Sequence, residues 1–238
     1  MENHHDIREM NKLGLDSYLE DYEFPDLEEM LKDAIEKLHT DLTKAGKEYE
    51  EAVVKESKSE YSDVPYIIDE IYSIQDRLLL VYEMIIVNDY KEFEIVIKRL
   101  LKASLDFDEK DFRSFDNLKP FLKSKGISFA EVENYNDIND LRKVNNYIKH
   151  SKIREIPDDL KQIKEFKSTK NLSYLELMQF HQRIKDLRYH FIFDLKDKIY
   201  SYLYEFDDDR INNIALRMFK RMGTDHINSL IKKLTKLK

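Results

Sequence analysis

The sequence predicts an all-α protein: a helical bundle with a long, coiled-coil-like helix near the N-terminus and a basic helix at the C-terminus. Only four glycines and four prolines occur among the 238 residues, so few positions break a helix or force a turn. Apolar side chains also recur at spacings of three and four residues, which is the period of one helix face. A chain of this length buries a core without disulfides.

The first long helix is expected over residues 26–57, with Pro25 and Asp26 near its start. Its apolar residues alternate at spacings of four and three, the pattern of a coiled-coil seam. The seam fits either an antiparallel neighbour within the same chain or a second copy in a dimer, and both alternatives stay open. The seam residues are Leu31, Ile35, Leu38, Leu42, Ala45, Tyr49 and Ala52.

Two later segments are apolar around most of their circumference and should form the centre of the bundle. They cover residues 65–88 and 173–205. A shorter helix should end at Gly126, because glycine readily adopts the positive φ that follows many helix ends. The remaining helices are expected over residues 90–103, 136–151, 208–221 and 225–236, and the acidic run 207–209 marks one of the starts.

Charge divides the chain more clearly than its formal net value of -8 suggests. Residues 1–60 carry 18 acidic and 8 basic side chains, whereas residues 142–170 carry 9 basic and 4 acidic ones. Residues 217–238 carry 7 basic side chains and 1 acidic one. We therefore expect an acidic N-terminal segment (1–60), a helical bundle (61–206) and a C-terminal helical appendage (207–238).

The last helix has an apolar stripe opposed by a basic face. It either closes the bundle or contacts RNA, an acidic partner or anionic lipid, and these alternatives stay open. The stripe consists of Ile227, Leu230, Ile231, Leu234 and Leu237, and the basic face of Lys232, Lys233, Lys236 and Lys238.

The absence of cysteine excludes a disulfide framework, thiolate catalysis and Cys-ligated metals. The N-terminus has no apolar signal core and the most apolar window is interrupted by charges, so we expect a cytoplasmic protein without a membrane span. No cofactor is expected, since there is no glycine-rich phosphate loop or nucleophile elbow. No metal site is expected either, because Asp186, His190 and Asp194 fit a surface hydrogen-bond set better than a ligand set.

The run LRKVNNYIKHSKIR, residues 141–154, carries the chemistry of the chain. On a helical wheel Leu141, Val144 and Ile148 form one apolar face. The opposite face combines a guanidinium, an ammonium, an imidazole and amides, which are the groups that bind an RNA phosphodiester and act on it without a metal. An ordinary solvated helix face is the other interpretation. The polar face is expected to hold Arg142, Asn145, Asn146, Lys149 and His150.

This run resembles the motif helix of the HEPN superfamily, helical-bundle proteins of prokaryotic toxin–antitoxin, abortive-infection and CRISPR-linked systems. The family motif has an Arg, usually followed by Asn or another polar residue, and a His about four to six residues further on. Leu141 and Arg142 match the Leu-Arg pair with which the motif of many members begins. Asn146 matches the motif asparagine and His150 the motif histidine. Asn145 stands where the family has the motif arginine, and seven residues separate Arg142 from His150.

The resemblance implies roles for particular residues. His150 would assist attack of an RNA 2′-hydroxyl on the adjacent phosphate, Arg142 or Lys149 would stabilise the developing charge, and Asn146 would orient the imidazole. Substrate contacts are expected from Asn145, Lys149, Lys152 and Arg154. Arg183 and His190 repeat the Arg-to-His spacing in the helix over 173–205 and are secondary candidates.

Two functions follow as expectations. The first is a metal-independent endoribonuclease of an antiviral defence or toxin system, acting on RNA as a homodimer with an antitoxin or other protein partner. The second is a catalytically inactive helical interaction module that binds a protein or RNA.

Overall fold

The computed structural model describes residue 14 and residues 26–56, 63–105, 115–151 and 154–236. Over these residues the chain forms α-helices and short 3-10 turns and no strand, so the all-α prediction is confirmed. No helix in this part of the chain is both long and apolar enough to span a bilayer. The chain divides into two compact units, residues 1–198 and 199–238, while the expected boundaries after residues 60 and 206 stay predictions.

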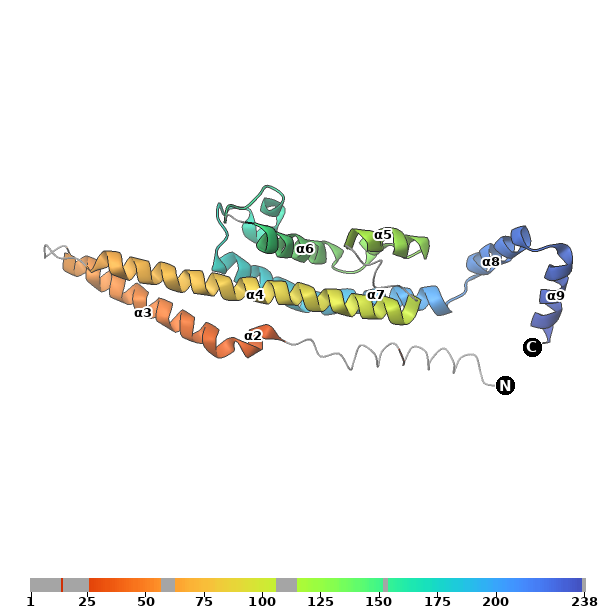
Figure 1. Ribbon diagram of the computed structural model, residues 1–238, viewed down its shortest axis with the longest axis horizontal. Helices are drawn as coiled ribbons and strands as arrows, with labels where there is room; N and C mark the ends of the chain where they lie inside the picture. The colour runs from red at the N-terminus through yellow and green to blue at the C-terminus, as the bar shows by residue number, and fades with distance from the viewer. Residues whose placement is uncertain (1–13, 15–25, 57–62, 106–114, 152–153, 237–238) are drawn as a thin grey trace. The chain divides into compact units, whose positions relative to one another are not determined.

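The first unit begins with α2 (Leu27–Met30) and α3 (Lys32–Glu56), which pack along α4 (Val64–Leu105) as an antiparallel hairpin (Figure 1). The Asp26 carboxylate caps α2 by accepting a 3.1 Å hydrogen bond from the Glu29 N–H. Ile35 and Ala45 of the predicted seam are buried against α4. The seam therefore faces a neighbour in the same chain, which is the first of the two alternatives.

Helix α4 runs without interruption from Val64 to Leu105, so the expected break between residues 88 and 90 is wrong. The Asn-Asp pair at residues 88 and 89 favours a turn in isolation. No glycine or proline follows Pro65 in this segment, however, and Asp89 is buried between His181 and Arg188 of another helix. Tertiary pairing thus outweighs local preference and keeps α4 in one piece.

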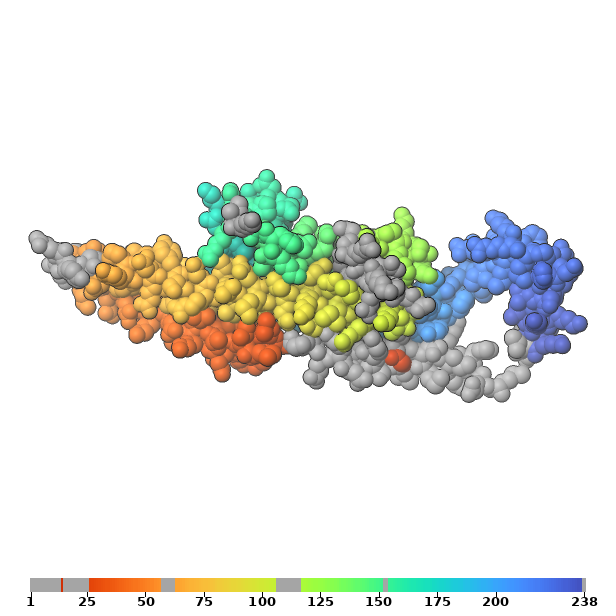
Figure 2. All heavy atoms as spheres, in the orientation of Figure 1, coloured from red at the N-terminus to blue at the C-terminus, as the bar shows by residue number. Residues whose placement is uncertain are grey.

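The short helix α5 (Phe115–Ser124) ends as predicted at Gly126, whose φ is +76°. The N–H of Ile127 donates to the Leu122 carbonyl at 3.0 Å and the N–H of Gly126 to the Lys123 carbonyl at 3.0 Å, which is a Schellman motif. After a 3-10 turn, η2 (Phe129–Glu131), helix α6 (Tyr135–His150) lies against α4 (Figures 1 and 2).

A loop between α6 and α7 (Tyr174–Tyr204) folds back over the end of α6 and contains the turns η3 (Leu160–Gln162) and η4 (Lys164–Phe166). An isolated antiparallel bridge between Glu155 and Asn171 closes its base. Four buried side chains attach the loop to the bundle: Ile156, Leu160, Ile163 and Phe166.

The core between α4 and α7 includes a cluster of aromatic rings and one set of buried charges. The ring centroid of Phe191 lies 5.5 Å from that of Phe93 and 5.5 Å from that of Phe129, both in edge-to-face geometry. Asp89, only 4% exposed, places its two carboxylate oxygens 3.1 Å from His181 Nε2 and 2.8 Å from Arg188 Nη1.

The buried charges also reach α2. Glu28 Oε2 lies 3.7 Å from His181 Nδ1 and 3.5 Å from Lys185 Nζ. His181 is 2% exposed, so both ring nitrogens face carboxylates away from solvent. Three helices far apart in sequence are therefore held together by one group of charges, which the sequence alone did not indicate.

The second unit contains the end of α7, α8 (Asp208–Arg221) and α9 (Thr224–Thr235). The Asp207 side chain accepts a 2.7 Å hydrogen bond from the Arg210 N–H, so the acidic run starts α8 as predicted. Arg210 Nη1 donates to the Ser201 carbonyl at 3.1 Å and thereby fixes the turn between α7 and α8. Gly223 precedes α9.

Replacing Asp89 with asparagine should destabilise the bundle strongly, because the buried Arg188 guanidinium loses its counter-charge. We expect a loss of about 3–5 kcal/mol in the free energy of unfolding measured by urea titration. Asp76→Asn is the matched control, since Asp76 also lies on α4 and pairs with an arginine, but at the surface. That change should cost less than about 1 kcal/mol. Equal losses for the two variants would contradict this account of Asp89.

Candidate functional site

The second half of α6 forms one wall of a cavity of about 520 Å³. The loop that follows the helix supplies the opposite wall. The helix side is lined by Arg142, Lys143, Asn146, Tyr147, His150 and Ser151, and the loop side by Pro157, Asp159 and Leu160.

The core packing of α6 determines which side chains reach this cavity. Leu141 and Val144 are fully buried against α4, which fixes the rotation of the helix about its axis. The Tyr147 hydroxyl donates to the Glu155 carbonyl at 3.1 Å and so joins the helix to the loop. Burial raises the pKa of the Tyr147 phenol, which therefore stays protonated as a hydrogen-bond donor at neutral pH.

The cavity wall on α6 is rich in positively charged groups. Arg142 Nη2 donates to Asn139 Oδ1 at 3.2 Å, and Lys143 Nζ lies 3.8 Å from Asp140 Oδ1. These contacts hold the charged ends of both cations, about two turns before the exposed His150. An anion in the cavity would meet a guanidinium, an ammonium and an imidazole on one side, and the exposed carboxylate of Asp159 on the other.

Three of the predicted residues meet in the cavity: Arg142, Asn146 and His150. Asn145 does not line it, because its side chain is only 1% exposed and its amide donates to Asn146 Oδ1 at 3.4 Å. At about 100° per residue, Asn145 lies only about 40° from Leu141, next to the apolar stripe. The expectation that Asn145 lies on the polar face is therefore wrong.

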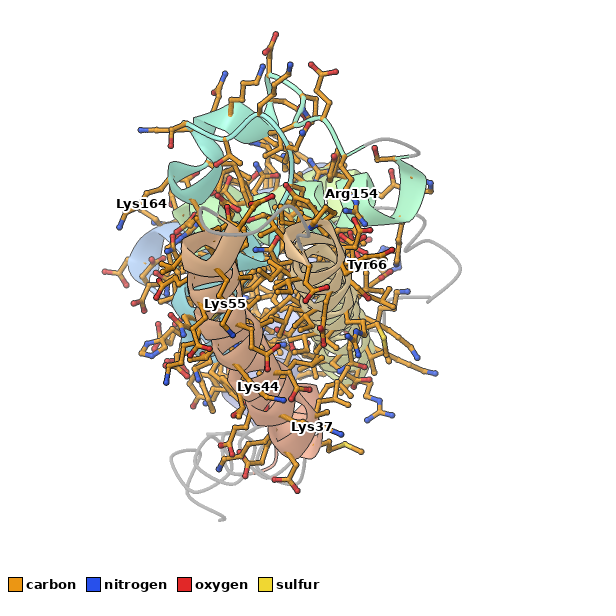
Figure 3. All side chains as sticks on the ribbon, turned by 90° about the vertical axis from the view of Figure 1, so that its left-hand side faces the viewer. Lys37, Lys44, Lys55, Tyr66, Arg154 and Lys164 are labelled. Atoms are coloured by element: carbon orange, nitrogen blue, oxygen red, sulfur yellow. The ribbon has the colours of Figure 1, made fainter. Side chains whose placement is uncertain are left out.

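The other predicted substrate contacts lie elsewhere. Lys149 is exposed and does not line the cavity, and Lys152 lies outside the described residues. Arg154 pairs with Asp76 at 2.7 Å and lines a different cavity, of about 650 Å³, beside α4. Figure 3 shows Arg154 on the α4 side, whereas Lys164 projects on the other side.

The secondary candidates occupy different environments. Arg183 donates two hydrogen bonds to Glu165, at 2.8 and 3.0 Å, and also pairs with Asp137 and Asp140. Burial lowers the pKa of Arg183. The hydrogen bonds that Arg183 donates to Glu165 and the charges of the neighbouring carboxylates outweigh the effect of burial and leave the pKa above its ordinary value. Arg183 therefore clamps α7 to α6 and η4, while His190 on α7 is exposed.

Asp194, the third residue of the i, i+4, i+8 set on α7, takes part in surface hydrogen bonding. It accepts a 2.8 Å hydrogen bond from the Glu133 N–H and lies 3.4 Å from Lys198 Nζ. Within the described residues no three His, Cys, Asp or Glu side chains are arranged to hold a metal ion.

Sequence reasoning missed six residues that line the cavity, of which four are polar: Lys143, Tyr147, Ser151 and Asp159. The helical wheel contained a signal for two of them, since Lys143 and Tyr147 lie within about 60° of His150. Nothing in the sequence pointed to Asp159, which reaches the cavity only because the loop folds back.

No family model, curated protein or solved structure matches this chain.

Acid should weaken the clamp formed by Arg183. Burial raises the pKa of Glu165, but the hydrogen bonds from Arg183 outweigh it and leave the pKa below its ordinary value of 4.5. Because the folded-state pKa is the lower one, this stabilisation is present above the ordinary value and is lost as the pH falls through the lowered pKa. Glu165→Gln should thus be less stable near neutral pH and depend less on pH.

Urea unfolding between about pH 6 and pH 3 measures this difference. Asp158→Asn is a suitable control, because Asp158 pairs with Lys161 at 2.8 Å entirely at the surface. It should keep the wild-type stability and slope. A wild-type pH slope in Glu165→Gln would show that the clamp contributes nothing to acid sensitivity.

Proposed function

We propose that this chain is a HEPN-like component of a prokaryotic defence or toxin system that cleaves RNA in the cytoplasm without a metal ion. The observation that carries the proposal is the meeting of Arg142, Asn146 and His150 in a single cavity. These are the residues that match the resemblance, and the cavity also contains a second cation, Lys143. The core face of α6 holds the helix rigidly, and its open face presents cations to a phosphodiester.

The reaction would be an internal transfer at phosphorus. His150 accepts the proton of a ribose 2′-hydroxyl, whose oxygen then forms a bond to the adjacent phosphorus. The bond from phosphorus to the 5′-oxygen breaks, and that oxygen takes up a proton from the solvent. The products are a 2′,3′-cyclic phosphate and a 5′-hydroxyl, so RNA is cleaved and DNA, which lacks the 2′-hydroxyl, is not.

The cations of the cavity would stabilise charge on the phosphate oxygens. Arg142 presents paired donors to a phosphate, and Lys143 adds a second positive charge on the same wall. Asn146, at the turn before His150, is placed to orient the imidazole or the substrate. Lys149, which the resemblance offered as a second cation, is replaced in this role by Lys143.

The second candidate function is RNA or protein binding without cleavage. It is favoured by Asn145, which stands where the family has an arginine and is buried away from the cavity. Since Asn145 offers no guanidinium, Arg142 would supply it to the cavity from nearly one turn earlier. In either function the resemblance implies a homodimer and a protein partner such as an antitoxin.

His150→Ala should abolish cleavage of single-stranded RNA with excess chelator present, lowering the rate by about 100-fold or more. Gel analysis of the fragments, with detection of the 2′,3′-cyclic phosphate ends, measures the rate and the chemistry. His226→Ala is the control, because His226 is an exposed histidine on α9. If the wild-type protein binds RNA but never cleaves it, the nuclease proposal is wrong and the binding module is favoured.

Arg142→Gln should lower the cleavage rate by about 100-fold, since a donor to the transition-state oxygens is lost. Arg77→Gln provides the comparison, because Arg77 is an exposed arginine on α4 that lines the other cavity. It should cleave RNA at the wild-type rate. If Arg142→Gln cleaved equally well, Arg142 would not be the substitute for the missing motif arginine.

A further inference from the structure

Helices α8 and α9 expose apolar surface that the second unit does not cover. Neither helix contains a buried residue. On α8, Phe219 is 70% exposed and Leu216 54%, and on α9 Ile231 and Leu234 are each 56% exposed. Helices of 14 and 12 residues are marginal in water unless an apolar face is covered, so this surface needs an occupant.

The apolar surface of α8 is broad. From Ile214 to Phe219, the apolar side chains spread over about half of the helix circumference. A helix–helix seam needs a narrower stripe of apolar residues. A surface this wide fits an extended plane better than the side of a single partner helix.

Beyond the first turn of α8, which carries Asp208 and Asp209, the polar surface of both helices is basic. Between residues 217 and 236 the chain has six basic side chains and one acidic side chain, Asp225. On α8 the basic side chains fill the half of the wheel that the apolar ones leave free, and on α9 the lysines oppose the apolar stripe. The residues are Arg217, Lys220 and Arg221 on α8, Lys232 and Lys233 on α9, and Lys236 directly after α9.

We infer that α8 and α9 bind the surface of an anionic lipid bilayer, with their apolar faces in the interface and their basic side chains near the lipid headgroups. Two short amphipathic helices with basic polar faces have the composition of interfacial membrane anchors. The positive charge complements an anionic headgroup layer. RNA would engage the basic side chains but leave the apolar half of α8 in water. The inference does not depend on the ribonuclease proposal.

Sedimentation of the full-length chain with lipid vesicles tests the inference. Vesicles of phosphatidylcholine with about one third phosphatidylglycerol should bind the protein at low salt, and vesicles of phosphatidylcholine alone should bind it at least 10-fold less. Raising the salt concentration should weaken binding to the anionic vesicles. Absence of binding to anionic vesicles, or equal binding to both compositions, would overturn the inference.

Matched double variants separate the two contributions. Lys232→Glu with Lys233→Glu should reduce binding to the anionic vesicles by about 100-fold or more. Lys37→Glu with Lys55→Glu changes the net charge equally on the exposed side of α3 (Figure 3) and should bind like the wild type. Leu216→Ser with Phe219→Ser should also lose binding, whereas Tyr66→Ser with Tyr72→Ser, exposed on α4, should not. Equal losses in a control pair would refute the assignment to α8 and α9.

A gain of binding guards against variants that merely unfold. Asn213→Lys and Ser229→Lys add charge at exposed positions on the basic faces, and each should tighten binding to anionic vesicles about 5-fold. Unchanged binding would count against the inference.

Light scattering of the wild type and of Leu216→Ser with Phe219→Ser tests the competing occupant. If the wild type is a dimer that these substitutions dissociate, a second copy of the chain is the occupant and not a lipid surface. If no vesicles bind and a basic-face variant loses affinity for RNA, RNA is the occupant.

Discussion

The arrangement of α2, α4 and α7 depends on the neutralisation of one buried carboxylate, that of Asp89. Placed in the middle of a helix and away from water, this charge would destabilise the fold unless it met opposite charge within hydrogen-bond distance. Arg188 supplies that charge from α7, and His181 lies beside the second carboxylate oxygen, so the two fix both the rotation and the axial position of α7 against α4. Aromatic packing can then complete a core whose register is already determined.

Core packing likewise determines which side chains of α6 belong to the candidate site. Leu141 and Val144 are held in the core, so the helix cannot turn to present other residues. Arg142 and His150 remain at the cavity, while Asn145 is drawn inward beside the apolar stripe. One residue expected on the polar face is therefore lost to packing, and Lys143 takes a place among the cations of the cavity. The chemistry of the site follows from the core of the bundle as much as from its polar residues.

Periodicity in the sequence was sufficient to predict the helical fold, the ends of α7 and α8, and the glycine after α5, because these depend on local spacing and capping. It failed at Asn88 and Asp89, where two turn-forming residues stay helical through contacts with residues almost one hundred positions away. For the site, the wheel identified Arg142, Asn146 and His150 but misplaced Asn145. The far wall of the cavity could not be predicted, since it depends on the path of a loop and not on a repeating pattern.

The loop over α6 is closed at its base, where the Ile156 N–H donates to the Lys170 carbonyl at 3.0 Å and the Leu172 N–H to the Arg154 carbonyl at 2.8 Å. Exposed positions between these bonds, such as Asp159, can therefore change without altering the path of the chain into α7, whereas the buried side chains of the loop and Glu165 cannot. The helix wall of the cavity is constrained by the bundle, whereas the loop wall is constrained only at its anchoring residues. A substitution at exposed Asp159 would thus change what the cavity accepts while leaving the bundle intact, so ligand preference and stability are set by different residues.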